Sequence, residues 1–252
     1  MTGPFDLHGT TALVTGSRRG IGFAMAVALA EAGADIIGVS AQQESTGSAI
    51  EDAVRAAGRS FTPMTCDFAD RDAVVALAAD LTAHEVDILV NNAGAIERAP
   101  AVDHPLDSWD RVLQIDLSSP FILTQAVGRG MLERGRGKVI FTASLLSFQG
   151  GINVPGYAAA KSGIAGLTRA LSNEWAPHGV TVNAIAPGYI ATDNTEALRA
   201  DPDRSQAILG RIPAGRWGTG ADLAGATVFL AAPASDYVTG IVLPVDGGWL
   251  AR

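Results

Sequence analysis

The chain has 252 residues, of which 48% are apolar and 17% are charged, and this composition is ample for the core of a large globular domain. Its formal net charge of −8 would repel nucleic acid and anionic membranes, so we expect neither as a partner. The single cysteine, Cys66, excludes an internal disulfide and a cysteine-based metal cage, and we expect no metal site. The sequence shows no signal peptide and no apolar run of about 18 residues, which predicts a soluble, cytoplasmic protein.

Strand-like runs alternate with helix-like stretches along the chain. The strand-like runs cover 11–15, 35–39, 60–65, 87–91, 138–142, 181–186 and 241–245. The helix-like stretches cover 22–32, 44–57, 71–83, 108–131, 156–175 and 222–231. This alternation predicts an α/β fold for residues 1–252, a single-domain Rossmann-like doubly wound parallel sheet of about seven strands with helices on both faces.

The least regular part of the chain is the segment 189–220, which is rich in Arg, Asp and Pro. In a doubly wound fold, loops that leave the carboxyl ends of the strands line the ligand crevice. A long loop at that place commonly closes over the substrate, so we expect a lid at about 189–220. A tolerated surface insertion is the alternative interpretation.

A glycine-rich turn follows the first strand-like run and leads into an alanine-rich helix. In Gly16-Ser-Arg-Arg-Gly20-Ile-Gly22, the first glycine permits the tight turn and the second lets the backbone approach a pyrophosphate. Gly22 allows close packing of the helix, whose free N–H groups face the anion. The order strand, glycine turn and helix therefore predicts a dinucleotide site.

Tyr157 and Lys161 are four residues apart, and Ser144 lies thirteen residues before Tyr157. On a helix, such a pair shares one face, and a nearby ammonium favours the phenolate over the phenol. Such a tyrosine can exchange a proton at neutral pH, and the hydroxyl of Ser144 can hold a carbonyl or alkoxide oxygen beside it. The trio suits interconversion of a carbonyl and an alcohol. An ordinary helix-surface pair is the alternative for Tyr157 and Lys161.

These motifs resemble the short-chain dehydrogenase/reductase family over the full length of the chain. The matching features are the glycine loop 15–22, Asn91-Asn-Ala-Gly94, Asp67, Pro187-Gly188 with Thr192, and the trio of Ser144, Tyr157 and Lys161. The resemblance implies that Tyr157 exchanges the substrate proton, that Ser144 positions the oxygen, and that Lys161 also binds the nicotinamide ribose. It implies a cofactor site made of Gly16, Ser17, Arg18, Arg19, Gly20, Ile21, Gly22, Ser40, Asp67, Phe68, Asn92, Ala93, Gly94, Tyr157, Lys161, Pro187, Gly188, Ile190 and Thr192.

One catalytic position departs from the family pattern. The family usually has asparagine where this chain has Asp116, and that residue helps hold the water that links the catalytic lysine to solvent. Asparagine is thought to act there through its backbone carbonyl, which Asp116 would preserve. A carboxylate near Lys161 would also stabilise the ammonium and weaken its effect on Tyr157, so we expect slower catalysis.

The cofactor preference depends on what meets the adenosine ribose. No acidic residue occurs in 36–42, where a carboxylate would bind the 2′-hydroxyl of NAD and repel the 2′-phosphate of NADP. Arg18 and Arg19 carry guanidinium groups that can pair with this phosphate, so NADP(H) is favoured over NAD(H). Solvated loop arginines are the alternative, and the family includes sugar-acid enzymes that use NAD.

Within the family, the stretches 147–151, 173–175, 186–192, 211–218 and 245–252 resemble enzymes of deoxy keto sugar acids such as 2-dehydro-3-deoxy-D-gluconate. The expected substrate contacts are Ser144, Gln149, Tyr157 and Arg199, and the further arginine candidates for the carboxylate are Arg204, Arg211 and Arg216. A 3-oxoacyl or other carbonyl reductase is the first alternative, and a non-catalytic cofactor-binding sensor is the second.

The resemblance also implies a homotetramer. The apolar C-terminal tail with Trp249 and Leu250 would then lie at a subunit contact or near a neighbour's active site. Folding back of the tail on its own subunit is the alternative.

Overall fold

The computed structural model of the protein describes residues 3–252, and over this range the strands form one parallel sheet in the order β3-β2-β1-β4-β5-β6-β7. The strands are β1 (Thr11–Thr15), β2 (Asp35–Ser40), β3 (Phe61–Thr65), β4 (Ile88–Asn91), β5 (Gly137–Thr142), β6 (Val180–Pro187) and β7 (Val242–Val245). The strand order reverses between β1 and β4, and ligands bind at such a switch point, outside the carboxyl ends of the strands. The predicted fold class is confirmed.

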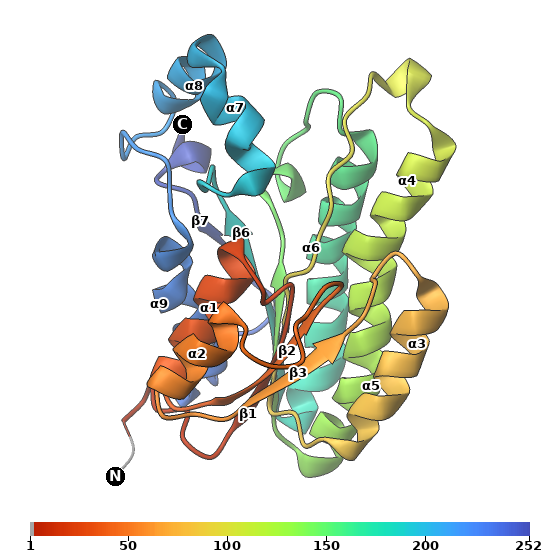
Figure 1. Ribbon diagram of the computed structural model, residues 1–252, viewed down its shortest axis with the longest axis vertical. Helices are drawn as coiled ribbons and strands as arrows, with labels where there is room; N and C mark the ends of the chain where they lie inside the picture. Colours follow the sequence, from red (N-terminus) through yellow and green to blue (C-terminus); the bar gives the residue numbers. More distant parts are fainter. Residues whose placement is uncertain (1–2) are drawn as a thin grey trace.

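Helices cover both faces of this sheet (Figure 1). One face carries α1 (Gly20–Glu31), α2 (Ala49–Ala56) and α9 (Ala224–Ala231). The other face carries α3 (Arg71–Asp80), α4 (Leu106–Leu113), α5 (Ser119–Arg134) and α6 (Pro155–Trp175). Every residue of β4 and of β6 is buried, as expected for central strands covered on both faces. Buried apolar residues accordingly form two large clusters, one on each face of the sheet.

The predicted helices differ from the structure in their bounds, and the largest differences are in two of them. The stretch 44–57 is helical only from Ala49, because the Ser48 side chain accepts the Glu51 N–H and caps the helix there. The stretch 108–131 is divided into α4, a π-helical turn at Gln114–Ser118 and α5. Pro120 has no N–H to donate to the carbonyl of residue 116, which accounts for the break in the α-helical pattern.

The segment 189–220 contains two helices that the sequence analysis did not predict, α7 (Glu196–Ala200) and α8 (Pro202–Leu209). The Asp201 side chain caps the second of them by accepting two backbone N–H groups. Figure 1 shows both helices beyond the carboxyl ends of the strands. Ile208 and Ile212 pack there against Leu145 and Trp249. Trp249 is only 4% exposed, so the C-terminal tail packs on its own subunit.

None of the helices in 3–252 is both long enough and apolar enough to cross a bilayer. Within the same range, His, Cys, Asp and Glu side chains form no group of three or more that could hold a metal ion. Cys66 is a free, buried thiol.

Candidate active site

A cavity of about 1250 Å³ opens at the carboxyl ends of the strands, at the switch point between β1 and β4. Its walls come from the glycine loop, the ends of β2 to β6, the first turns of α6 and the segment 189–220. The predicted site residues that line it are Gly16, Arg18, Arg19, Gly20, Ile21, Ser40, Asp67, Phe68, Asn92, Ala93, Gly94, Ser144, Gln149, Tyr157, Lys161, Pro187, Gly188, Ile190 and Thr192. The structure therefore brings nearly all of them to one place.

The shape of the glycine loop depends on two of its glycines and on Asn92. Gly16 has a φ of 68°, which a residue with a side chain rarely adopts. A Cβ on Gly22 would lie 2.2 Å from the carbonyl oxygen of Gly16, so only glycine fits where α1 packs against the loop. Asn92 ties the end of β4 to the loop by donating its side-chain amide to Thr15 O at 3.1 Å. Gly22 therefore shapes the pocket without lining it.

The N-terminus of α1 has the features of an anion site. Its N-cap residue, Arg19, makes no side-chain cap hydrogen bond, and its first turn contains no acidic residue. By contrast, Ser48 and Asp70 cap α2 and α3. The first N–H groups of α1 thus lack a side-chain acceptor and face the cavity through Gly20 and Ile21, as a pyrophosphate requires.

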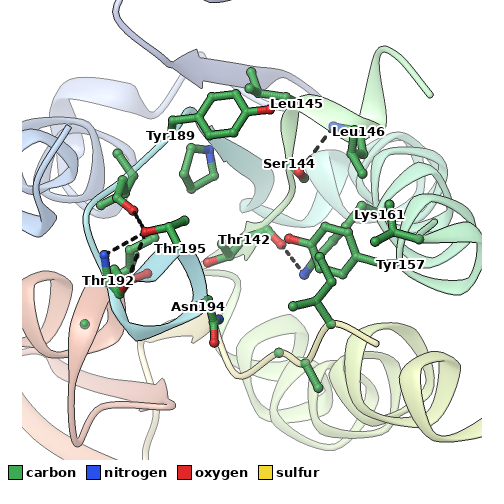
Figure 2. Close-up of a pocket in the computed structure, with 18 of the residues that line it drawn as sticks. Thr142, Ser144, Leu145, Leu146, Tyr157, Lys161, Tyr189, Thr192, Asn194 and Thr195 are labelled. Carbon is green, nitrogen blue, oxygen red and sulfur yellow. Dashed lines mark hydrogen bonds between the residues drawn. The ribbon is translucent and has the colours of Figure 1, made fainter. Parts of the chain in front are cut away.

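Tyr157 and Lys161 lie in the first two turns of α6, and Ser144 follows β5. Lys161 is only 4% exposed, so the pair is not an ordinary helix-surface pair. The Lys161 Nζ donates to Thr142 O at 2.9 Å and lies 5.5 Å from the centre of the Tyr157 ring. Figure 2 shows these side chains around one space, with the Tyr157 hydroxyl directed into it.

Ser144 is held by its neighbours in an orientation that leaves its proton free. Its Oγ accepts the Leu146 N–H at 3.2 Å, and the Ser147 hydroxyl in turn donates to Lys161 O at 2.6 Å. Among residues 3–252, the Ser144 Oγ acts only as an acceptor. Its O–H is therefore available to a ligand oxygen in the cavity.

Asp116 lies behind the cavity wall, next to Lys161. Its Oδ1 accepts the Ala95 N–H at 3.0 Å and is 3.7 Å from the Lys161 Nζ. Gly94 leaves room for this carboxylate, since a Cβ there would lie 2.7 Å from Oδ1. Burial raises the pKa of Asp116, and the charge of Lys161 opposes that rise. Among the described residues, Asp116 Oδ2 is buried without a hydrogen-bond partner.

The two loop arginines expected to meet a phosphate already have acidic partners. The Arg18 Nη2 lies 2.7 Å from Glu44 Oε1, and the Arg19 Nη1 donates to Asp193 Oδ2 at 2.6 Å. Ser17 is buried and does not line the cavity. These pairs are not evident from the sequence, because the partners lie 26 and 174 residues away in the chain.

An aromatic cluster lies at the cavity beside the segment 189–220. Tyr189 packs against Trp217 and Trp249 with ring centres 5.5 and 4.7 Å apart. The Arg211 guanidinium lies 4.0 Å over the Trp249 ring, and its Nη2 is 3.5 Å from Gln149 Oε1. Figure 2 shows Tyr189, labelled with Thr192, Asn194 and Thr195, on the side of the pocket away from Tyr157.

Among the arginine candidates for the carboxylate, Arg204 and Arg211 line the cavity, as does Arg98, which the sequence analysis did not single out. Arg199 does not line it, and its Nη2 donates to Thr192 O at 3.3 Å. Arg216 is bound to Asp222 by two hydrogen bonds, of 2.6 and 2.8 Å. Trp249 and Tyr189 also line the cavity but were not predicted as site residues.

Known proteins resemble this chain over nearly its full length. A family model described as enoyl-(acyl carrier protein) reductase matches residues 16–250. A protein from Pseudoalteromonas atlantica named 2-dehydro-3-deoxy-D-gluconate 5-dehydrogenase is 59% identical over 250 residues, which is 98% of each chain.

Two solved structures share the fold nearly throughout. A protein from Beutenbergia cavernae, with NADP bound at low occupancy, has a TM-score of 0.95 and 48% identity over 99% of this chain and 100% of the other. A gluconate 5-dehydrogenase from Burkholderia cenocepacia in complex with NADP and tartrate has a TM-score of 0.93 and 39% identity, over 99% and 98% of the two chains. The chain therefore belongs to the short-chain dehydrogenase/reductase family of NAD(P)-dependent oxidoreductases.

Proposed function

We propose that the protein interconverts a secondary alcohol and a ketone on a deoxy keto sugar acid, with 2-dehydro-3-deoxy-D-gluconate as the substrate and C5 as the reacting carbon. The observation that carries this proposal is the placement of Ser144, Tyr157 and the buried Lys161 in one cavity, which Arg204 and Arg211 also line. The name of the relative at 59% identity supports the choice of substrate.

The cavity fits a nicotinamide dinucleotide, which supplies the hydride acceptor and donor when it is bound. The uncapped first turn of α1 would hold the pyrophosphate, since Gly20 and Ile21 present it to the cavity. Asp67 and Phe68 would line the adenine, and Pro187 and Gly188 the nicotinamide. Side chains of the protein itself carry out the proton transfer and position the substrate.

We assign the proton transfer to Tyr157. In oxidation the phenolate accepts the proton of the substrate hydroxyl, and in reduction the phenol returns it to the new alkoxide. Ser144 donates its free O–H to the same substrate oxygen, which keeps that oxygen beside the phenol. Lys161 is buried with its Nζ 5.5 Å from the ring centre, which places this side chain beside the group that exchanges the proton.

We assign to Asp116 the task of positioning Lys161. The ammonium is held between Thr142 O and Asp116 Oδ1, and both partners come from elements that pack in the core. This fixes the Nζ beside the Tyr157 ring. The same carboxylate, when ionised, offsets part of the Lys161 charge, which makes the pH dependence of the enzyme sensitive to Asp116.

We assign the substrate carboxylate to Arg211. Its guanidinium is stacked on Trp249, which fixes its plane, and it has no acidic partner among the described residues. A planar guanidinium held in this way presents two parallel N–H donors, the geometry that a carboxylate accepts. Gln149 is within reach of both Arg211 and Trp249 and would bind a substrate hydroxyl.

We propose NADP(H) as the favoured cofactor, with NAD(H) also accepted. Arg18 lines the cavity beside Ser40, where a doubly wound fold places the adenosine ribose. Two structures that share the fold contain NADP, which supports this choice. Because Arg18 already has an acidic partner, we propose that the protein uses NAD(H) as well.

We further propose that residues 1–252 act as one domain, that 189–220 closes over the substrate, and that the protein works as a cytoplasmic homotetramer. Ile208 of α8 belongs to the apolar cluster at the cavity wall, and Leu198 of α7 packs against the same cluster. Several large apolar side chains are exposed, among them Val102 and Leu106 at 92% and 78%, as expected of a surface that a second subunit covers. Sedimentation equilibrium tests the assembly, and a monomer at micromolar concentration would contradict it.

The test of the catalytic proposal is a substrate screen with both cofactors. We expect NAD(P)+ reduction with 2-dehydro-3-deoxy-D-gluconate and little oxidation of NAD(P)H with 3-oxoacyl thioesters. Turnover of the thioesters alone would make the protein a carbonyl reductase of another substrate class. Binding of the cofactor without turnover of any keto sugar acid or thioester would make it a sensor.

A further inference from the structure

One ion pair joins the glycine loop to the segment that follows β2. The Arg18 Nε donates to Glu44 Oε1 at 2.9 Å, and its Nη2 lies 2.7 Å from the same oxygen. The hydrogen bond raises the pKa of Arg18 and lowers that of Glu44, so both groups are charged at neutral pH. The sequence alone shows no acid at the end of β2, but the fold brings one to the loop arginine from four residues further on.

The backbone that carries Glu44 is held by buried contacts. Gln43 is only 7% exposed, its N–H donates to Ser40 O at 3.3 Å, and its carbonyl accepts the Thr65 hydroxyl at 3.2 Å. The Ser17 hydroxyl reaches the side chain of Gln43 from the glycine loop at 3.5 Å. The backbone at Glu44 is therefore held in a fixed position next to the glycine loop.

The location of this pair matters because the adenosine ribose of a dinucleotide lies at the end of the second strand in this fold. Ser40, Gln42 and Arg18 line the cavity at that point. The second carboxylate oxygen of Glu44, Oε2, is buried and lacks a hydrogen-bond partner within residues 3–252. The negative charge of Glu44 would repel a 2′-phosphate bound at this point.

We infer that Glu44 sets the relative affinity for NADP(H) and NAD(H), because it holds the Arg18 guanidinium. Without Glu44, this guanidinium would pair fully with a 2′-phosphate. The inference rests on the proposed cofactor site. With NADP(H), the phosphate has to share Arg18 with a neighbouring carboxylate. With NAD(H), the ion pair between Arg18 and Glu44 stays intact, and no phosphate meets the negative charge of Glu44. Arg19 is held in a comparable way by Asp193, so neither loop arginine is without an acidic neighbour.

The test measures cofactor binding by calorimetry and does not require the substrate. Full-length wild-type protein and Glu44→Gln are titrated with NADPH and with NADH. We expect the ratio of Kd for NADH to Kd for NADPH to rise about tenfold in Glu44→Gln, because Arg18 is released and a repulsive charge is removed. In 1 M NaCl the difference between the two proteins shrinks, since screening weakens exposed charges. In an Arg18→Ala background, the same change at Glu44 should raise the ratio by less, because only the loss of the repulsive charge remains.

Glu85→Gln is the matched control, because Glu85 is an exposed acid that pairs with Arg136 just before β4 and does not line the cavity. Its ratio should equal that of the wild type. An unchanged ratio in Glu44→Gln, or an equal rise in Glu85→Gln, overturns the inference. A rise in Asp193→Asn without one in Glu44→Gln would assign the effect to Arg19 instead and also overturn it. Failure of the wild-type protein to bind either cofactor would overturn the proposed function, and the inference with it.

Discussion

The carboxylate of Asp116 lies 3.7 Å from the ammonium of Lys161, and both side chains are buried. Burial favours the neutral acid and raises the pKa of Asp116, while the lysine charge favours the anion and lowers it. Below the pKa of Asp116 in the folded protein, Lys161 therefore exerts its full charge on Tyr157. Above it, the carboxylate offsets part of this charge.

The change Asp116→Asn should accordingly alter the pH–rate profile. Asparagine cannot ionise, so we expect kcat of the variant to exceed that of the wild type by roughly three- to tenfold on the alkaline side, with the two converging as Asp116 of the wild type becomes protonated. The measurement is kcat against pH at saturating substrate. Asp110→Asn, the same change at an exposed position of α4, is the control. Superimposable profiles of Asp116→Asn and wild type would disprove the electrostatic role of Asp116.

The change Tyr157→Phe keeps the ring beside Lys161 but removes the proton carrier. We expect kcat to fall by about 10²–10⁴-fold, the range that general acid–base groups contribute, while the Kd for NADPH changes little. Stopped-flow measurement of hydride transfer, together with calorimetric cofactor binding, checks both parts. Tyr237→Phe, at a fully exposed tyrosine, should leave both quantities unchanged. Turnover near the wild-type level in Tyr157→Phe would remove this residue from the proposed reaction.

The sequence predicted the sheet well for a physical reason. Central strands covered on both faces are short, continuous apolar runs, and the bounds of β1 at Thr11–Thr15 agree with the prediction. The glycine loop and the catalytic trio were also evident, because their spacing is local: four residues on α6 place Tyr157 and Lys161 on one face.

Features that depend on distant parts of the chain were not evident. The partner of Arg19 is 174 residues away, and the partner of Arg18 lies beyond the end of β2. Helices α7 and α8 are short, and apolar periodicity is a weak signal at that length. The choice among the lid arginines could not be made from sequence, because only the stacking on Trp249 distinguishes Arg211.

The assignment of Arg211 to the substrate carboxylate predicts the effect of Arg211→Lys. Lysine keeps the charge but loses the planar fork and the stack on Trp249, so we expect KM for the keto sugar acid to rise about 10–100-fold with a smaller change in kcat. Arg216→Lys is the matched control, since Asp222 already binds this guanidinium and it does not line the cavity. An equal rise in KM in both variants would indicate a general effect of the lid and contradict the assignment.

Cys66 provides a check on the packing beneath the cofactor site. Burial raises the pKa of its thiol from 9.0 to about 11, and the nearby charges of Asp67 and Asp70 add to this rise. At a given pH well below 9, the thiolate fraction in the folded protein is then about 100-fold smaller than in the unfolded chain, since each pKa unit is a factor of ten. We therefore expect a disulfide reagent at pH 8 to label native protein at least 100-fold more slowly than protein in 6 M guanidinium chloride, because the thiol is also 3% exposed. Rapid stoichiometric labelling of the native protein would show that the end of β3 opens readily and that Cys66 is not the inert apolar group that its burial indicates.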